Sequence, residues 1–334
     1  MSFKNTRLVK INAHPRDYFQ QTAKRGERDY IMSVSGLKEF IECPAKFLAK
    51  DEDDEATASK DWGSLIDCLL LVPEQFNERF AVTPETYPDS KTGEPKKWAA
   101  NATYCRDWKE SRNEAGIEIV RRNTYDEALK AVARMKSDSR IMTFINDSDK
   151  QVWLATEWHD EKTGLVIPFR VMLDLRPRND SEFYKCLGDM KAIKSAALVP
   201  FQRQVFQYKW HVQAAAYHDV YVSAFPNEDR CTWCFVIQEN KPPFQFGRRI
   251  LSEEFDALGR ATYTRALANY CQCLKHNHWP DFDETDESAD GWSFVKPEPW
   301  MESDGLFAPH FEFENESPDA EPAPAEGADQ GIVP

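Results

Sequence analysis

The chain has 334 residues, of which 41% are hydrophobic and 13% aromatic, enough for the core of one large domain or two modest ones. No run of about 18 apolar residues occurs, which argues against a membrane-spanning helix, and the N-terminus lacks the apolar stretch of a signal peptide. The net charge of −14 argues against a nucleic-acid partner, but residues 281–334 alone hold 16 acidic residues and one lysine. The first 280 residues hold 40 acidic and 41 basic residues, so the body of the chain can present a basic groove.

The cysteines give an expectation about the compartment. There are eight of them, scattered along the chain, and no export signal precedes them. We therefore expect reduced thiols in a cytoplasmic protein, with no disulfide framework.

The N-terminal part of the chain divides into an extension and a helix. Residues 1–30 are polar and are expected to be extended or loosely docked. The apolar periodicity that follows predicts a helix, capped by Ser33 or Ser35 and interrupted by Pro44.

The next segment combines a buried helix with a polar, helical insert. The stretch "WGSLIDCLLLVP" (62–73) predicts a buried helix that a proline ends, and on it Gly63 and Asp67 share a face because they lie four residues apart. Residues 81–98 form a proline-rich loop, and two amphipathic helices are expected within an insert at about 95–140.

The centre of the chain has the alternating pattern of β-strands. In 165–175 every odd position is apolar, and the even face carries Asp174. In 183–192 one face carries Asp189 and Lys191. A hairpin of these two strands is expected to pack one side into the core and to gather the charged groups on the opposite side.

The C-terminal third is predicted to contain a helix at 200–224, a strand at 230–239 and a helix at 252–275. Beyond residue 314 the composition is acidic and rich in proline and alanine, so residues 315–334 are expected to form a disordered tail.

The charged residues of the hairpin indicate a chemistry. Burying unpaired charge is costly, so Asp174, Asp189 and Lys191 should compensate one another or bind an ion. Two carboxylates on adjacent strands, with the backbone carbonyl of Met190, suit magnesium, which prefers oxygen ligands. Lys191 can orient an attacking water or stabilise a phosphate in the transition state. A plain salt bridge at the sheet edge is the alternative.

The order of these motifs resembles the PD-(D/E)xK nuclease superfamily, in which an acidic residue precedes a D-x-K strand by about 15 residues. Other stretches are similar to the exodeoxyribonuclease VIII (RecE-type) exonucleases of phages and prophages. They run in order over roughly residues 30–300: "IMSVSGLKEFIECPAKF", "WGSLIDCLLLVPEQF", "GDMKAIKSA", "YKWHVQAAAYHDVY" and "WPDF". The resemblance implies an α/β fold with a restriction-endonuclease-like core, a central mixed β-sheet flanked by helices, within an exonuclease domain at 31–314.

The resemblance also implies roles for matching residues. Asp174 and Asp189 correspond to the metal-binding carboxylates and Lys191 to the catalytic lysine. Gln213 and Tyr217 match a Q-x-x-x-Y helix beside the active site, although both also lie on the apolar stripe of their helix and can be core residues.

Two further positions match the family pattern only in part. The family usually has a histidine ligand where this chain has Asp67. A carboxylate there would make the site more anionic and would reach less far than an imidazole; the alternative is that Asp67 is no ligand. Glu157 matches an acid common before the hairpin, and is either a supporting residue of the site or an exposed strand residue.

The activity that the resemblance implies is a magnesium-dependent deoxyribonuclease, also supported by Mn²⁺, that digests linear duplex DNA from its ends in the 5′-to-3′ direction and leaves 5′-phosphates. It further implies a ring-shaped homo-oligomer, such as a tetramer, a single-strand annealing recombinase as partner, and the cytoplasm of a bacterium or phage-infected cell. Phosphate contacts would come from lysine and arginine side chains, and the candidates are Lys194, Arg203, Lys96 and Lys97. A related endonuclease, a single-strand exonuclease or a non-catalytic DNA-binding protein remain alternatives.

Overall fold

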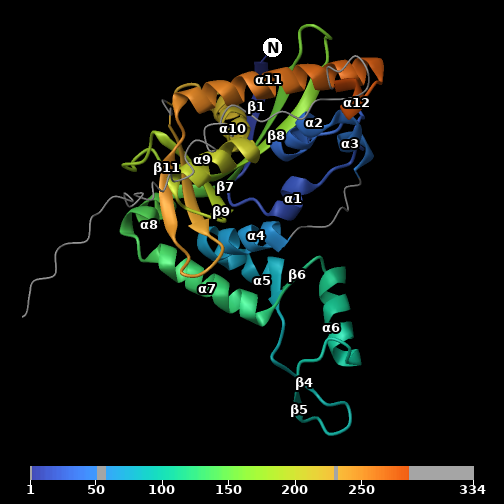
Figure 1. Ribbon diagram of the computed structural model, residues 1–334, viewed down its shortest axis with the longest axis vertical. Coiled ribbons are helices and arrows are strands. Elements are labelled where there is room, and N and C mark those ends of the chain that lie inside the picture. Colours follow the sequence, from blue (N-terminus) through green and yellow to red (C-terminus); the bar gives the residue numbers. More distant parts are fainter. Residues whose placement is uncertain (1, 51–57, 229–231, 286–334) are drawn as a thin grey trace, which may run out of the picture. The chain divides into compact units, whose positions relative to one another are not determined.

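The computed structural model describes residues 2–50, 58–228 and 232–285 (Figure 1). They belong to one compact unit that ends at Thr285. The predicted acidic tail and residues 286–314 of the predicted exonuclease domain lie outside the described residues. None of the helices in the described part combines the length and apolar composition that a bilayer crossing requires.

A mixed sheet forms the centre of the described fold. Its strands lie in the order β1 (Ser2–Lys10), β7 (Ser148–His159), β8 (Val166–Pro177), β9 (Cys186–Ile193), β10 (Thr232–Glu239) and β11 (Phe246–Ile250). Neighbouring strands are antiparallel except for the parallel pair of β9 and β10, and the short β2 (Met32–Ser33) lies parallel to β8.

Helices cover both faces of this sheet. One apolar cluster joins it to α2 (Val34–Glu42), α10 (Trp210–Ala224) and α11 (Glu253–His276). The other joins it to α4 (Ala58–Leu71), α7 (Arg122–Lys136) and α8 (Ser139–Asn146). This arrangement, visible in Figure 1, confirms the predicted α/β fold with a central mixed β-sheet flanked by helices. The hairpin pattern alone suggested that one face of the sheet is open. Instead helices cover both faces, so the acidic residues of β8 and β9 lie between packed layers.

The N-terminal segment is more closely joined to the sheet than its polar sequence indicates. Residues 2–10 form β1, which pairs with β7 from Ser2 opposite His159 to Lys10 opposite Trp153. Strand β1 is thus an edge strand. Its own sequence lacks the apolar alternation that predicts a buried strand, whereas its partner β7 has it.

The helix predicted at 200–224 is two helices. The first, α9, spans Leu198–Gln207, and α10 begins at Trp210. Between them Lys209 adopts a left-handed conformation with φ of 52°, which ends one helix and redirects the chain into the next.

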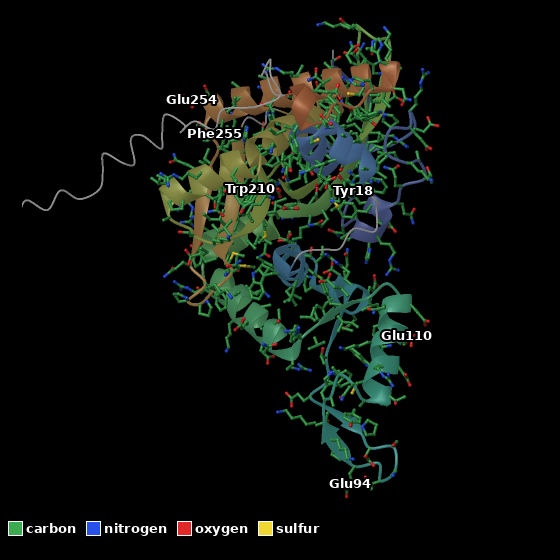
Figure 2. The ribbon with its side chains drawn as sticks, turned by 45° about the vertical axis from the view of Figure 1, so that its right-hand side comes forward. Tyr18, Glu94, Glu110, Trp210, Glu254 and Phe255 are labelled. Carbon is green, nitrogen blue, oxygen red and sulfur yellow. The ribbon has the colours of Figure 1, made fainter. Side chains whose placement is uncertain are left out.

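An arm extends from the sheet between α5 (Phe76–Arg79) and α7. It contains the hairpin of β4 (Thr86–Pro88) and β5 (Pro95–Lys97) and the helix α6 (Thr103–Glu114), and Glu94 and Glu110 mark it in Figure 2. Two aromatic pairs stiffen it, Tyr87 with Tyr104 and Trp98 with Trp108. The remaining elements are α1 (Pro15–Phe19), α3 (Pro44–Ala49), the 3₁₀ turn η1 (Pro73–Gln75), β3 (Phe80–Val82), β6 (Glu118–Val120) and α12 (Phe282–Thr285).

Candidate active site

Strands β8 and β9 meet at one backbone pair, Leu175 opposite Gly188, and part beyond it. A Cβ on Gly188 would lie 2.6 Å from the ring of Phe144 and 2.9 Å from Cβ of Leu175, so only glycine allows this approach. Because the strands are antiparallel, the next residues along them, Asp174 and Asp189, lie side by side.

This close approach gives a stability prediction. Gly188→Ala should lower the free energy of unfolding by about 1–3 kcal/mol, because the added methyl group overpacks a buried contact. Gly63→Ala on α4 is the matched control, since its Cβ would meet Ala192 at 4.0 Å, an ordinary contact, and alanine is the better helix former. In denaturant unfolding, Gly188→Ala should be less stable than the wild type and Gly63→Ala more stable. Equal stabilities of the two variants would contradict the close packing of β8 and β9.

The carboxylate of Asp174 takes the place of a backbone carbonyl as hydrogen-bond acceptor for β9. Its Oδ2 accepts a hydrogen bond of 2.9 Å from the backbone N–H of Met190, a group that a continued ladder would pair with a carbonyl of β8. The side chain is thereby fixed at the point where the two strands separate.

Asp189 is 2% exposed and has two polar neighbours. Its Oδ1 accepts a 2.9 Å hydrogen bond from Nε2 of Gln213, and its Oδ2 forms an ion pair with the ammonium group of Lys191. Lys191 also donates to the backbone carbonyl of Met190 at 3.2 Å. Burial alone would lower the pKa of Lys191, but the negative charges of Asp189 and Asp174 outweigh it and raise that pKa, so the lysine is an ammonium ion at neutral pH.

Asp67 belongs to the same cluster. Helix α4 packs on β9 through Gly63, and Asp67 lies one turn further on the same face. Burial, and then the charge of Asp174, raise the pKa of Asp67 well above its ordinary value. Burial and the charge of Asp189 likewise raise the pKa of Asp174 to about 7. Three carboxyl groups thus share one region, and the neighbouring negative charges help to raise the pKa of Asp67 and of Asp174.

The donor set suits a hard divalent cation. Carboxylate oxygens and the Met190 carbonyl are the ligands that such ions prefer, and the buried Oδ2 of Asp189 has the ammonium group of Lys191 as its polar partner. In the described part of the chain, however, no three His, Cys, Asp or Glu side chains converge tightly enough to enclose a metal as they stand. The ammonium group of Lys191 contacts both Asp189 and the Met190 carbonyl, so it supplies positive charge to two of the predicted metal ligands.

The two residues predicted on α10 differ in their surroundings. Gln213 contacts Asp189 directly, as expected for a residue beside the site. Tyr217 is buried, packs edge-on against Trp233, and hydrogen-bonds to Tyr18 and to the backbone of Met172. Burial, and to a lesser degree the charges of Tyr18, Asp189 and Asp174, raise the pKa of Tyr217. Tyr217 is therefore packed in the core near the carboxylates, and its role in the site stays a prediction.

Glu157 lies apart from the cluster. It is opposite Pro168 on β8, six residues and therefore about 20 Å along the strand from Asp174. Its carboxylate instead accepts hydrogen bonds from Asn5 at 2.6 Å and contacts His159 at 3.1 Å. These contacts are those of an exposed strand residue.

The predicted phosphate-binding residues are exposed but scattered. Lys194 follows β9 directly, and Arg203 lies on α9. Lys96 and Lys97 lie on β5 in the arm, where Lys96 forms an ion pair with Asp89. Of the four, Lys194 is nearest in sequence to the acidic cluster.

Two polar residues of the site are missing from the sequence-based set. Gln151 lies on β7 between Lys150 and Val152, which pair with Leu175 and Leu173. It is 4% exposed, and its side chain hydrogen-bonds to the carboxyl group of Asp174. Its φ of 48° is a left-handed conformation that a residue other than glycine adopts at a cost of about 1–3 kcal/mol. Lys38 on α2 contacts Gln213. Gln151 lies in none of the quoted motifs, and Lys38 lies within "IMSVSGLKEFIECPAKF" without a role assigned to it, so only the folded arrangement identifies both.

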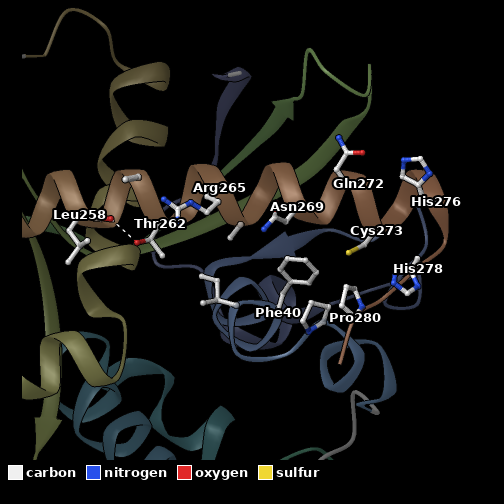
Figure 3. Close-up of a pocket in the computed structure, with 14 residues that line it drawn as sticks. Phe40, Leu258, Thr262, Arg265, Asn269, Gln272, Cys273, His276, His278 and Pro280 are labelled. Carbon is white, nitrogen blue, oxygen red and sulfur yellow. Dashed lines mark hydrogen bonds between the residues drawn. The ribbon is translucent and has the colours of Figure 1, made fainter. Parts of the chain in front are cut away.

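The cavity in Figure 3 is a separate feature. It measures about 630 Å³ and lies between α2, the start of α3 and α11, with Phe40, Cys273 and His276 in its wall. Asp67, Asp174, Asp189 and Lys191 do not line it, so this hollow is not where the carboxylates meet.

Comparisons with known proteins agree with this geometry. Residues 33–289 match the family described as "PDDEXK-like domain of unknown function (DUF3799)". A comparison with curated proteins gives no match. Among solved structures, the chain is similar to a "Putative exonuclease" from Eubacterium rectale, with a TM-score of 0.52 and 14% identity over 90% of this chain and 100% of that chain. At such low identity this likeness shows a common fold.

Proposed function

The chain belongs to the family of PDDEXK-like domains that it matches over residues 33–289, and from this membership we propose that it is a metal-dependent deoxyribonuclease. The observation that carries the proposal is the meeting of Asp174, Asp189 and Lys191 where β8 and β9 part. In this arrangement buried carboxylate oxygens outnumber the cations beside them, so a divalent ion would relieve their repulsion.

In the proposed mechanism each residue has a distinct task. Asp174 and Asp189, with Asp67 and the Met190 carbonyl, would hold Mg²⁺ or Mn²⁺. When bound, such an ion lowers the pKa of water and neutralises charge that develops on a phosphodiester. Gln213 keeps one oxygen of Asp189 in a fixed hydrogen bond. Lys191 remains protonated and donates to the phosphate oxygens as they gain negative charge.

We further propose the RecE-type activity that the sequence resemblance implies: 5′-to-3′ digestion of linear duplex DNA from its ends, leaving 5′-phosphates, in phage-type recombination. The sequence motifs "WGSLIDCLLLVPEQF" and "GDMKAIKSA" support this finer assignment. The same resemblance supports a homo-oligomeric ring and a single-strand annealing recombinase as partner.

Digestion of matched DNA substrates tests the proposal. Linear duplex should disappear with Mg²⁺ or Mn²⁺, remain intact with EDTA, and lose a label at the 5′ terminus before one at the 3′ terminus. A covalently closed circle of the same sequence should persist. Nicking of the circle would favour an endonuclease, digestion of single strands alone a single-strand exonuclease, and retardation without cleavage a DNA-binding protein.

A further inference from the structure

A lysine from outside the carboxylate cluster reaches the site through an amide. Nζ of Lys38, on α2, donates a 3.0 Å hydrogen bond to Oε1 of Gln213. Nε2 of the same amide donates a 2.9 Å hydrogen bond to Oδ1 of Asp189. Three elements that are distant in sequence, α2, α10 and β9, are thus joined in one chain of hydrogen bonds.

The order of donors in this chain has a consequence for Gln213. A glutamine amide has a donor end and an acceptor end, and only the donor end can bind a carboxylate. The reversed amide would place Oε1 against Asp189, oxygen against oxygen. A lysine ammonium donates but does not accept, so Lys38 in its protonated form selects the orientation in which the NH₂ group faces Asp189.

The surroundings of Lys38 disfavour a positive charge. Burial, and then the positive charge of Lys191, lower the pKa of Lys38 to about 7. Its hydrogen bond goes to a neutral amide, whereas Lys191 pairs with a carboxylate. The two lysines therefore hold opposite sides of Asp189: Lys191 contacts Oδ2 directly, and Lys38 acts on Oδ1 through Gln213.

We propose that Lys38 is a positioning residue of the active site, which holds the Gln213 amide in the orientation that fixes Asp189. This inference rests on the proposed nuclease function. It assigns no contact between Lys38 and DNA, which separates it from a role in phosphate binding.

A double-mutant cycle tests the proposal. The variants are Lys38→Met, which keeps the length and apolar stem of the side chain, Gln213→Ala, and the pair combined. Steady-state digestion of linear duplex gives kcat and KM, and titration with the same duplex in EDTA gives the Kd. Lys38→Met should lower kcat about 10- to 100-fold, as expected when a reacting group is misplaced, with KM and Kd within about twofold of wild type.

In the Gln213→Ala background the same Lys38→Met change should have little further effect, because the intermediary is already absent. Lys38→Arg, which still donates, should recover part of the loss. The control is Lys46→Ala on α3, an exposed lysine that pairs with Glu42, and it should match the wild type. A full loss in the Gln213→Ala background, or a rise in KM and Kd, would mean that Lys38 binds DNA directly and would overturn the proposal.

A crystal structure of the Lys38→Met protein gives a readout that does not require cleavage. Rotation of the Gln213 amide away from Asp189 supports positioning by Lys38 even if the wild type cleaves no DNA, whereas an unchanged Gln213–Asp189 hydrogen bond overturns it. Should Lys38→Met not fold, Lys38→Leu, which is shorter and likewise removes the donor, takes its place, and the same two measurements with the same outcomes apply to it.

Discussion

Lys191→Ala is expected to lower the rate of DNA cleavage by about a thousandfold while leaving the affinity for duplex DNA nearly unchanged. The ammonium group lies against Asp189 and the Met190 carbonyl, in largely buried surroundings that strengthen its effect on a charged phosphate. Trp210 covers it from α10, with its ring centroid 5.8 Å from Nζ. Single-turnover digestion measures the cleavage step, and retardation of the same duplex in EDTA measures binding.

Two other variants distinguish the effect of Lys191 on the cleavage step from the general attraction of positive charge for DNA. Lys194→Ala removes an exposed positive charge three residues along the chain and should weaken DNA binding in a salt-dependent way while kcat is retained. Lys191→Arg keeps the charge but not the compact ammonium group, and should recover only part of the rate. Wild-type turnover in Lys191→Ala would remove this lysine from the mechanism.

The strands that carry the site were predictable because their side chains alternate. The odd positions of 165–175 are apolar, and the structure buries Ile167, Phe169, Val171, Leu173 and Leu175 as expected. A period of two also places Asp189 and Lys191 on one face of β9, and the structure shows them as an ion pair. Local pattern was sufficient here because each strand is paired and packed along its length.

Features that depend on distant contacts were not predictable. The close approach of β8 and β9 at Gly188 also involves the ring of Phe144, which comes from α8, and the burial of the acids requires helices on both faces. The break at Lys209 follows from packing, since "YKWH" contains neither proline nor glycine to signal it. Lys38 and Gln151 reach the site through tertiary contacts, in which sequence spacing has no part.

The last prediction concerns the cost of gathering acids in a buried site. Asp174→Asn should abolish cleavage, a fall of at least about a thousandfold, because a neutral amide is a poor ligand for a hard cation. The same change should stabilise the metal-free protein. Asparagine can still accept the Met190 N–H bond through Oδ1, but it no longer ionises beside Asp189.

The sign of the stability effect follows from the pKa of Asp174, which burial and Asp189 raise from 3.8 to about 7. Between these two values the unfolded chain ionises this group while the folded chain keeps it protonated, so its contribution to folding stability is lost as the pH rises from about 4 to about 7. Asp174→Asn should therefore have the same stability as the wild type near pH 4. At pH 8 it should be more stable by roughly 1–4 kcal/mol, and the upper figure corresponds to the whole pKa shift of Asp174 at about 1.4 kcal/mol per pKa unit.

Denaturant unfolding in EDTA at several pH values measures this difference, and Asp149→Asn on β7 is the control. Asp149 lies 3.5 Å from Arg176 in an ion pair, so its removal should give no stabilisation at pH 8 and should leave cleavage intact. Adding Mn²⁺ should raise the stability of the wild type and not that of Asp174→Asn, because ligand binding to the folded state is the source of the increase. An Asp174→Asn protein that is less stable than the wild type at pH 8 would mean that the carboxylates do not repel one another, and the site would then lack the surplus of negative charge that a divalent ion requires.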